Sequence, residues 1–140
     1  MTSMTENVDP FNVDQTMVSA CITACAAARD LLETARSGLS ARLAESVADD
    51  RQDDARQDAH ERHQYALHGL AWMATYVEAL EAMRDWAEHL SARGDLGELE
   101  GLILRIAFGE YLSHIARGIP MGQGEIVRPE ELGLGVEEFQ

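Results

Sequence analysis

Apolar residues recur at steps of three and four along most of this 140-residue chain, and none of its periodic segments alternates with a period of two. Steps of three and four place side chains on one face of an α-helix, whereas a half-buried strand alternates by two. The chain is 46% hydrophobic and has only three prolines. These features predict an all-α fold without β-sheet, an antiparallel bundle of about three long helices around one core.

The first helix is expected to begin with Asp14 as its N-cap. Residues 1–13 are polar, carry a turn signal at Asp9–Pro10, and are expected to form a flexible leader. The helix's core-facing stripe consists mostly of small residues: Val18, Cys21, Cys25, Ala28, Leu32, Ala35 and Leu39. Small side chains let a neighbouring helix approach closely, so this helix should occupy a tightly packed position.

The two cysteines, Cys21 and Cys25, stand four residues apart within that stripe. A helix fixes both Cβ vectors in nearly the same direction, which aims the two thiols poorly for a bridge. We therefore expect two buried, reduced thiols, with a redox pair as the alternative.

The second helix is expected to start near residues 50–54 and to end at Arg93–Gly94, a length of about 40 residues. It carries two apolar stripes. The first contains Ala66, Leu70, Met73, Val77, Leu80 and Ala87, and the second contains Trp72, Tyr76, Ala79, Met83, Trp86 and Leu90. A helix that is apolar on two faces must be covered on both. The second stripe is covered either by the rest of the chain or by another subunit, and we expect a homodimer whose interface includes Trp72, Tyr76, Met83 and Trp86.

The third helix is expected from Glu98 to Arg117, with Gly118 ending it. Apolar residues surround most of its circumference, so little of it should face water. The short link at residues 93–97 makes the second and third helices antiparallel neighbours. Glycines and prolines after Ile119 predict an extended tail over residues 119–140 that lies over the bundle of residues 14–118.

The formal net charge is −14, and all eleven basic residues are arginine. This charge repels phosphate backbones and anionic lipid surfaces, which argues against nucleic-acid and membrane partners. No apolar run has the length of a transmembrane helix, and residues 1–9 lack the pattern of a secretory signal. We expect a soluble cytoplasmic protein.

Tests for catalytic and metal motifs point to no site in the chain. His60–Glu61 is followed by Gln64 where a zincin needs histidine, and no histidine has a carboxylate three residues before it, as a di-iron bundle requires. No Gly-x-Ser-x-Gly elbow is present. Arg105, Glu110 and His114 share the third helix; they form either an acid/base or ligand-anchoring cluster or, as we favour, a satisfied polar contact at the helix edge. No catalytic, cofactor-binding or metal-binding residue is therefore assigned.

Three segments, residues 68–80, 97–112 and 118–129, resemble the helical amino-terminal extension of bacterial acyl-CoA dehydrogenases of the methylsuccinyl-CoA dehydrogenase type. The matching positions include Trp72, Tyr76, Phe108, Glu110, Tyr111, Pro120, Gln123, Gly124 and Glu125. In that family the extension precedes the FAD-binding catalytic region, which would follow Gln140 here. The resemblance implies FAD in a partner or parent enzyme, where a glutamate removes the substrate α-proton and the flavin takes hydride; none of those residues is carried over to this chain. The Asp/Arg-rich stretch 49–63 departs from the family pattern.

Three functional hypotheses follow. The first is a non-catalytic helical association module that acts by self-association or by binding a flavoprotein dehydrogenase subunit. The second is one piece of a split FAD-dependent acyl-CoA dehydrogenase, active on a short-chain acyl-CoA only with its partner. The third is a bundle that holds a small apolar ligand between the second and third helices.

Overall fold

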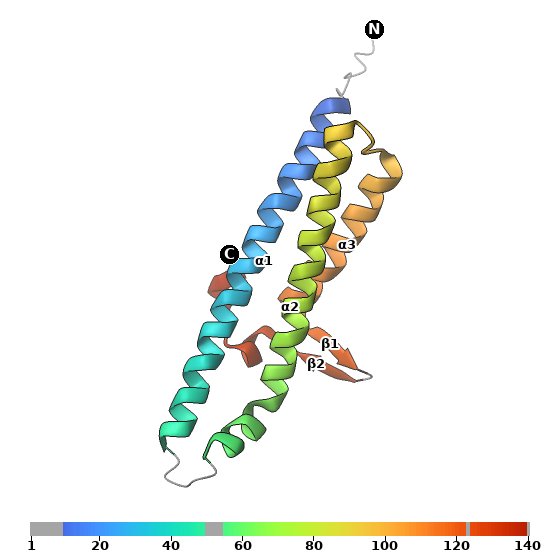
Figure 1. Ribbon diagram of the computed structural model, residues 1–140. Coiled ribbons are helices and arrows are strands. Elements are labelled where there is room, and N and C mark those ends of the chain that lie inside the picture. Colours follow the sequence, from blue (N-terminus) through green and yellow to red (C-terminus); the bar gives the residue numbers. More distant parts are fainter. Residues whose placement is uncertain (1–9, 50–54, 123, 140) are drawn as a thin grey trace, which may run out of the picture.

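Three antiparallel helices form the body of the protein in a computed structural model that describes residues 10–49, 55–122 and 124–139. They are α1 (Pro10–Asp49), α2 (Ala55–Arg93) and α3 (Glu98–Arg117). α1 and α2 run side by side over most of their lengths, and the shorter α3 lies beside α2 (Figure 1). The all-α bundle and its irregular carboxyl-terminal tail are confirmed.

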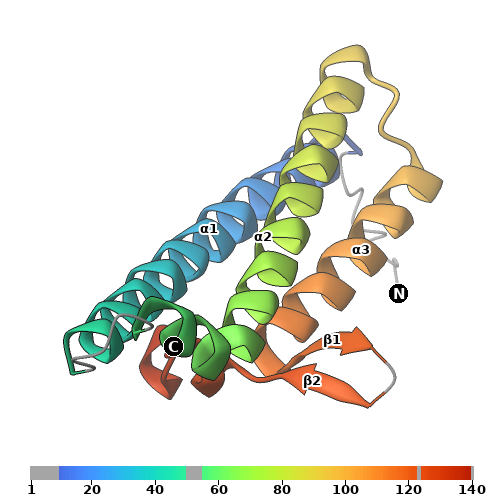
Figure 2. The same cartoon turned by 60° about the horizontal axis from the view of Figure 1, so that its bottom comes forward.

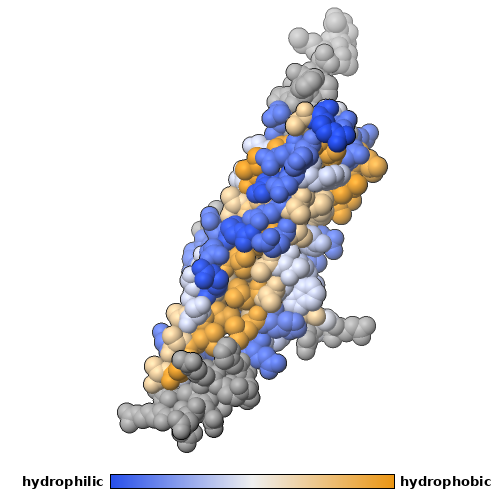
Figure 3. All heavy atoms as spheres, viewed as in Figure 1, coloured by the Kyte–Doolittle hydropathy of each residue, from blue (hydrophilic) through white to orange (hydrophobic). Residues whose placement is uncertain are grey.

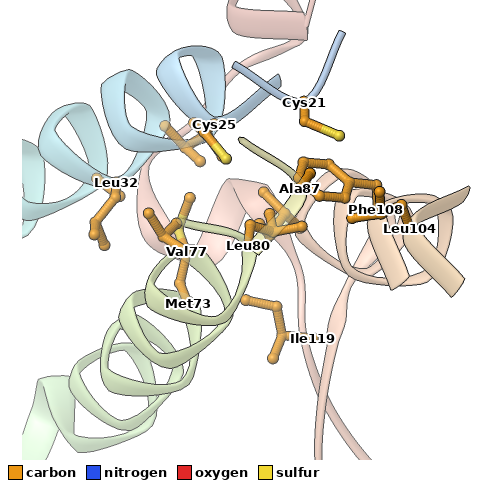
Figure 4. Packing of buried hydrophobic residues seen from close by; sticks show 14 of the residues in the cluster. Cys21, Cys25, Leu32, Met73, Val77, Leu80, Ala87, Leu104, Phe108 and Ile119 are labelled. Atoms are coloured by element: carbon orange, nitrogen blue, oxygen red, sulfur yellow. The ribbon is translucent and has the colours of Figure 1, made fainter. Parts of the chain in front are cut away.

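The core lies where the predicted stripes of the helices meet. The whole α1 stripe from Val18 to Leu39 is buried, and all but Leu70 of the first α2 stripe is buried. Leu104, Phe108 and Ile115 of α3 complete the cluster together with tail residues such as Ile119 (Figure 4). Cys21 and Cys25 are buried free thiols in this cluster, as expected from their spacing.

A charged contact joins α1 to α2 outside the core. The Arg29 guanidinium donates to both oxygens of the Glu81 carboxylate, at 2.9 Å from Nε to Oε1, and it also pairs with Glu78. The hydrogen bond from Arg29 is the main reason that the pKa of Glu81 lies below its usual range. This contact links α1 to α2 between residues that are 52 positions apart in the sequence.

The tail contains a β-hairpin, so the expectation of no β-sheet is wrong for this part of the chain. Strand β1 (Ile119–Gly122) pairs antiparallel with β2 (Glu125–Val127), with a register shift between Pro120 and Gly122. Strands of four and three residues are too short to reveal an alternating pattern among their glycines and prolines. Two 3-10 turns follow, η1 (Pro129–Leu132) and η2 (Val136–Phe139).

The tail lies against the bundle, as the sequence predicted (Figure 2). Val127, Leu132 and Leu134 are buried in the same core cluster as the helices. The Tyr65 hydroxyl of α2 donates to the backbone carbonyl of Ile126 at 2.6 Å, and Arg42 of α1 donates to the carbonyl of Glu131 at 3.1 Å. The tail is therefore an integral part of the fold.

The helix boundaries correct one prediction and confirm others. α1 begins at Pro10 rather than after Asp14; proline suits a first helical turn, where its missing N–H has no intrahelical acceptor in any case. The expected start of the second helix, residues 50–54, lies outside the described residues. α3 has the predicted bounds, and the Gly118 N–H donates to the His114 carbonyl at 2.8 Å with a φ of 136° that favours glycine.

Candidate interaction surface

The second apolar stripe of α2 is covered in part by α3. Trp72, Tyr76, Met83 and Trp86 are each partly buried and pack against the core cluster. The rings of Tyr76 and Tyr111 of α3 stack with their centroids 4.9 Å apart and an interplanar angle of 22°. The Trp72 ring meets Tyr76 edge-on at 6.3 Å. The structure thus places Tyr76 against α3 and Trp72 beside Tyr76. A subunit contact of the four residues stays a prediction.

The aromatic contacts fill space between α2 and α3. Burial is the main cause of the raised pKa of Tyr76, followed by the nearby Tyr111 and Glu110, so its phenol stays protonated well above neutral pH. The Trp72 indole Nε1 donates to Nε2 of His68 at 3.1 Å. These features are typical of structural aromatic packing.

Arg105, Glu110 and His114 do not form the polar contact favoured from sequence. No hydrogen bond or ion pair joins these three side chains within the described part of the chain, and Arg105 and Glu110 are exposed. The His114 ring lies 5.8 Å from that of Tyr76, and its buried Nδ1 has no partner among the described atoms. All three residues lie on α3, but at about 100° per residue Arg105 points to a different side of the helix from Glu110 and His114.

The largest departure from the sequence analysis is on α3, whose apolar circumference was expected to be enclosed. Four aliphatic residues face solvent there and define what we name the α3 outer face: Leu99, Leu102, Ile103 and Ile106, with exposed fractions of 64%, 47%, 41% and 66%. Apolar atoms are visible over the amino-terminal half of α3 in Figure 3. α1, α2 and the tail cover only part of the circumference of α3, so some of its apolar side chains remain in contact with solvent.

A shallow groove also runs along α1, lined by small and uncharged residues: Gln15, Thr16, Ser19, Ala20, Thr23, Ala24 and Ala27. The lining has no arginine to pair with the diphosphate of a flavin nucleotide, so the groove does not fit FAD. Within residues 10–49, 55–122 and 124–139, no group of three His, Cys, Asp or Glu side chains is placed to hold a metal ion. Among the described helices, none combines the length and apolarity needed to cross a membrane.

The geometry thus defines a helical module with two adjoining apolar surfaces, the partly covered stripe of α2 and the α3 outer face. The chain is 49% identical over 104 residues to (2S)-methylsuccinyl-CoA dehydrogenase of Cereibacter sphaeroides. The match covers 74% of this chain and 18% of that enzyme, which confirms the resemblance found in the sequence. The chain therefore resembles one region of an acyl-CoA dehydrogenase and spans less than a fifth of its length. No protein-family model matches the chain.

Proposed function

We propose that this chain is a non-catalytic helical association module of an acyl-CoA dehydrogenase system, which acts by packing against a flavoprotein subunit that carries the catalytic groups. The observation that carries the proposal is the match itself: 49% identity to a segment that makes up 18% of the relative. The remaining length of that dehydrogenase has no counterpart in the match, so the flavin chemistry belongs to another part of the system.

The exposed apolar surface supports association over catalysis. The aliphatic residues of the α3 outer face leave a patch in water that folding of this chain does not require. Monomeric proteins rarely expose large contiguous apolar patches, and those that do often use them for binding. A buried interface between helices is the ordinary use of such a surface.

Self-association through Trp72, Tyr76, Met83 and Trp86 is the second mode of the same function. Tryptophan and tyrosine contribute strongly to interfaces, and each of the four side chains keeps part of its surface exposed. A homodimer and a flavoprotein complex are compatible, because the α2 stripe and the α3 outer face are different surfaces.

The experiment that tests the proposal is purification of the intact tagged chain from its native host, with identification of bound protein by mass spectrometry and of flavin by visible absorbance. We expect the chain to retain an acyl-CoA dehydrogenase that carries FAD. Recovery of the chain with no flavoprotein at any salt concentration contradicts the proposal.

A second measurement separates this function from a split enzyme. The recovered flavoprotein, freed of the chain, is assayed for acyl-CoA oxidation with an artificial electron acceptor. We expect it to remain active alone, because no residue of this chain has been assigned to catalysis. Activity that appears only after the chain is added back supports the split enzyme instead.

A further inference from the structure

The exposed side of α3 has the spacing of a helix-packing seam. Leu99, Leu102, Ile106, Gly109 and Ser113 follow one another at steps of three, four, three and four. This pattern keeps one line of side chains facing a second helix, as the a and d positions of a coiled coil do. The first three are among the most exposed large hydrophobic residues of the described chain, so the seam has no partner within it.

Gly109 adds an independent indication of a close neighbour. Glycine inside a helix is unfavourable relative to alanine. A Cβ added at Gly109 would meet nothing within 4 Å, so no contact within the described part of the chain requires glycine there. Because glycine has no side chain, the backbone of a second helix could approach the α3 backbone closely near Gly109.

The α3 outer face alone is smaller than a typical stable interface. A stable interface buries about 800 Å² on each partner, whereas the exposed patch of a monomer is typically on the order of 300–600 Å². On the neighbouring side of α3, His114 lies beside Tyr76 of α2. The α3 outer face thus supplies the apolar centre of an interface, and the rest of the interface must come from residues around that face.

The net charge of this chain and the length of the related dehydrogenase favour one kind of partner for the α3 outer face. The chain carries a net charge of −14, so at the α3 outer face a partner with a basic rim around an apolar helix is favoured over a second copy of the chain. The match to the dehydrogenase covers 18% of that enzyme, so in the relative a much larger polypeptide is tethered beside the corresponding region. A covalent tether gives that polypeptide a high effective concentration at any uncovered face of the region.

We propose that the α3 outer face docks an apolar, basic-rimmed helix of the flavin-carrying dehydrogenase subunit. This inference rests on the proposed function and adds the surface through which it operates. The helix lies along the seam from Leu99 to Gly109 and excludes water from Leu102 and Ile106.

The experiment compares Ile106→Glu with Val136→Glu in the native-host purification of the intact chain. Both residues are exposed aliphatics, at 66% and 70%, so the two substitutions are chemically matched, but Val136 lies in η2, away from the seam. Leu99→Glu serves as a second seam variant. Circular dichroism melts verify that all three variants fold, which is expected because each side chain already faces water.

We expect the recovered flavoprotein to fall about tenfold or more for Ile106→Glu and Leu99→Glu, as for a charge placed in a desolvated contact, and to be unchanged for Val136→Glu. Equal recovery of flavoprotein with all variants would show that the α3 outer face is not the docking surface, and the proposed function would be unaffected. Recovery of only a second copy of the chain, lost in Ile106→Glu, overturns the choice of partner. Absence of flavoprotein from the unsubstituted chain refutes the proposed function as well.

Discussion

At the scale of single residues, the chemistry of the chain is that of packing. Burial raises the pKa of both Cys21 and Cys25, and that of Cys25 rises from its ordinary value of 9.0 to about 11. The thiolate is the reactive form of cysteine. A buried thiol with a raised pKa is therefore inert at neutral pH, which fits the structural role predicted from the i, i+4 spacing.

We expect both cysteines to react slowly with iodoacetamide in the folded chain at pH 7 and quickly after unfolding in urea. The raised pKa of Cys25 in the folded chain also stabilises the fold below pH 9, and this contribution is lost as the pH rises through about 11, because the thiol of the unfolded chain ionises first. Mass spectrometry of labelled protein and urea melts at pH 7 and pH 10 measure the two effects. Rapid native labelling at pH 7 contradicts this account.

At the scale of elements, the helices and the position of the tail against them were predictable, and the β-hairpin within the tail was not. The stripe from Val18 to Leu39 is buried as expected, because a helical period of 3.6 residues acts locally. The β-hairpin depends on contacts that no local pattern reveals, such as Val127 lying against Gly69, 58 positions earlier. The exposure of Ile106 was missed for the same reason, since periodicity identifies an apolar helix and only the packed fold identifies which sides remain uncovered.

The docking of the hairpin on α2 is tested by Gly69→Ala. A Cβ at position 69 would lie 2.6–2.9 Å from the side-chain atoms of Val127, whose branched side chain has little freedom to move. Overpacking of this kind costs about 1–3 kcal/mol. We expect a lower urea midpoint and increased proteolysis of the tail.

The matched control is Gly38→Ala in α1, where an added Cβ meets nothing within 4 Å. Relieving a helix-interior glycine should stabilise the chain by about 0.5–1 kcal/mol. A stabilising effect of alanine at both positions would show that the hairpin does not rest on Gly69.

At the scale of the whole molecule, α2 and α3 carry both residues that pack in the core and apolar residues that remain exposed for association. Trp86 was selected from the sequence as an interface residue, and it is partly buried against the core cluster. Ile106 stands free of that cluster. A substitution at Trp86 therefore tests folding together with the proposed self-association, whereas a substitution at Ile106 tests association alone.

We expect Trp86→Glu to lower the melting temperature at every protein concentration. Removing a fully buried aromatic side chain costs about 3–5 kcal/mol, so a partly buried one should cost about 2 kcal/mol, or roughly 5–10 °C for a chain of this size. Differential scanning calorimetry over a hundredfold range of concentration measures the shift. If Trp86 also takes part in the proposed self-association, the substitution should break the dimer as well. An unchanged melting temperature would contradict the packing of Trp86 against the core cluster.

The central claim is that this chain associates with a flavoenzyme and holds no flavin itself. Sedimentation velocity of material isolated from the native host, detected by both protein and visible flavin absorbance, tests it most directly. We predict that the flavin signal sediments only in a complex much larger than the 15.4 kDa chain, and that the chain separated from that complex is colourless. Flavin absorbance that sediments with the chain alone would contradict the account.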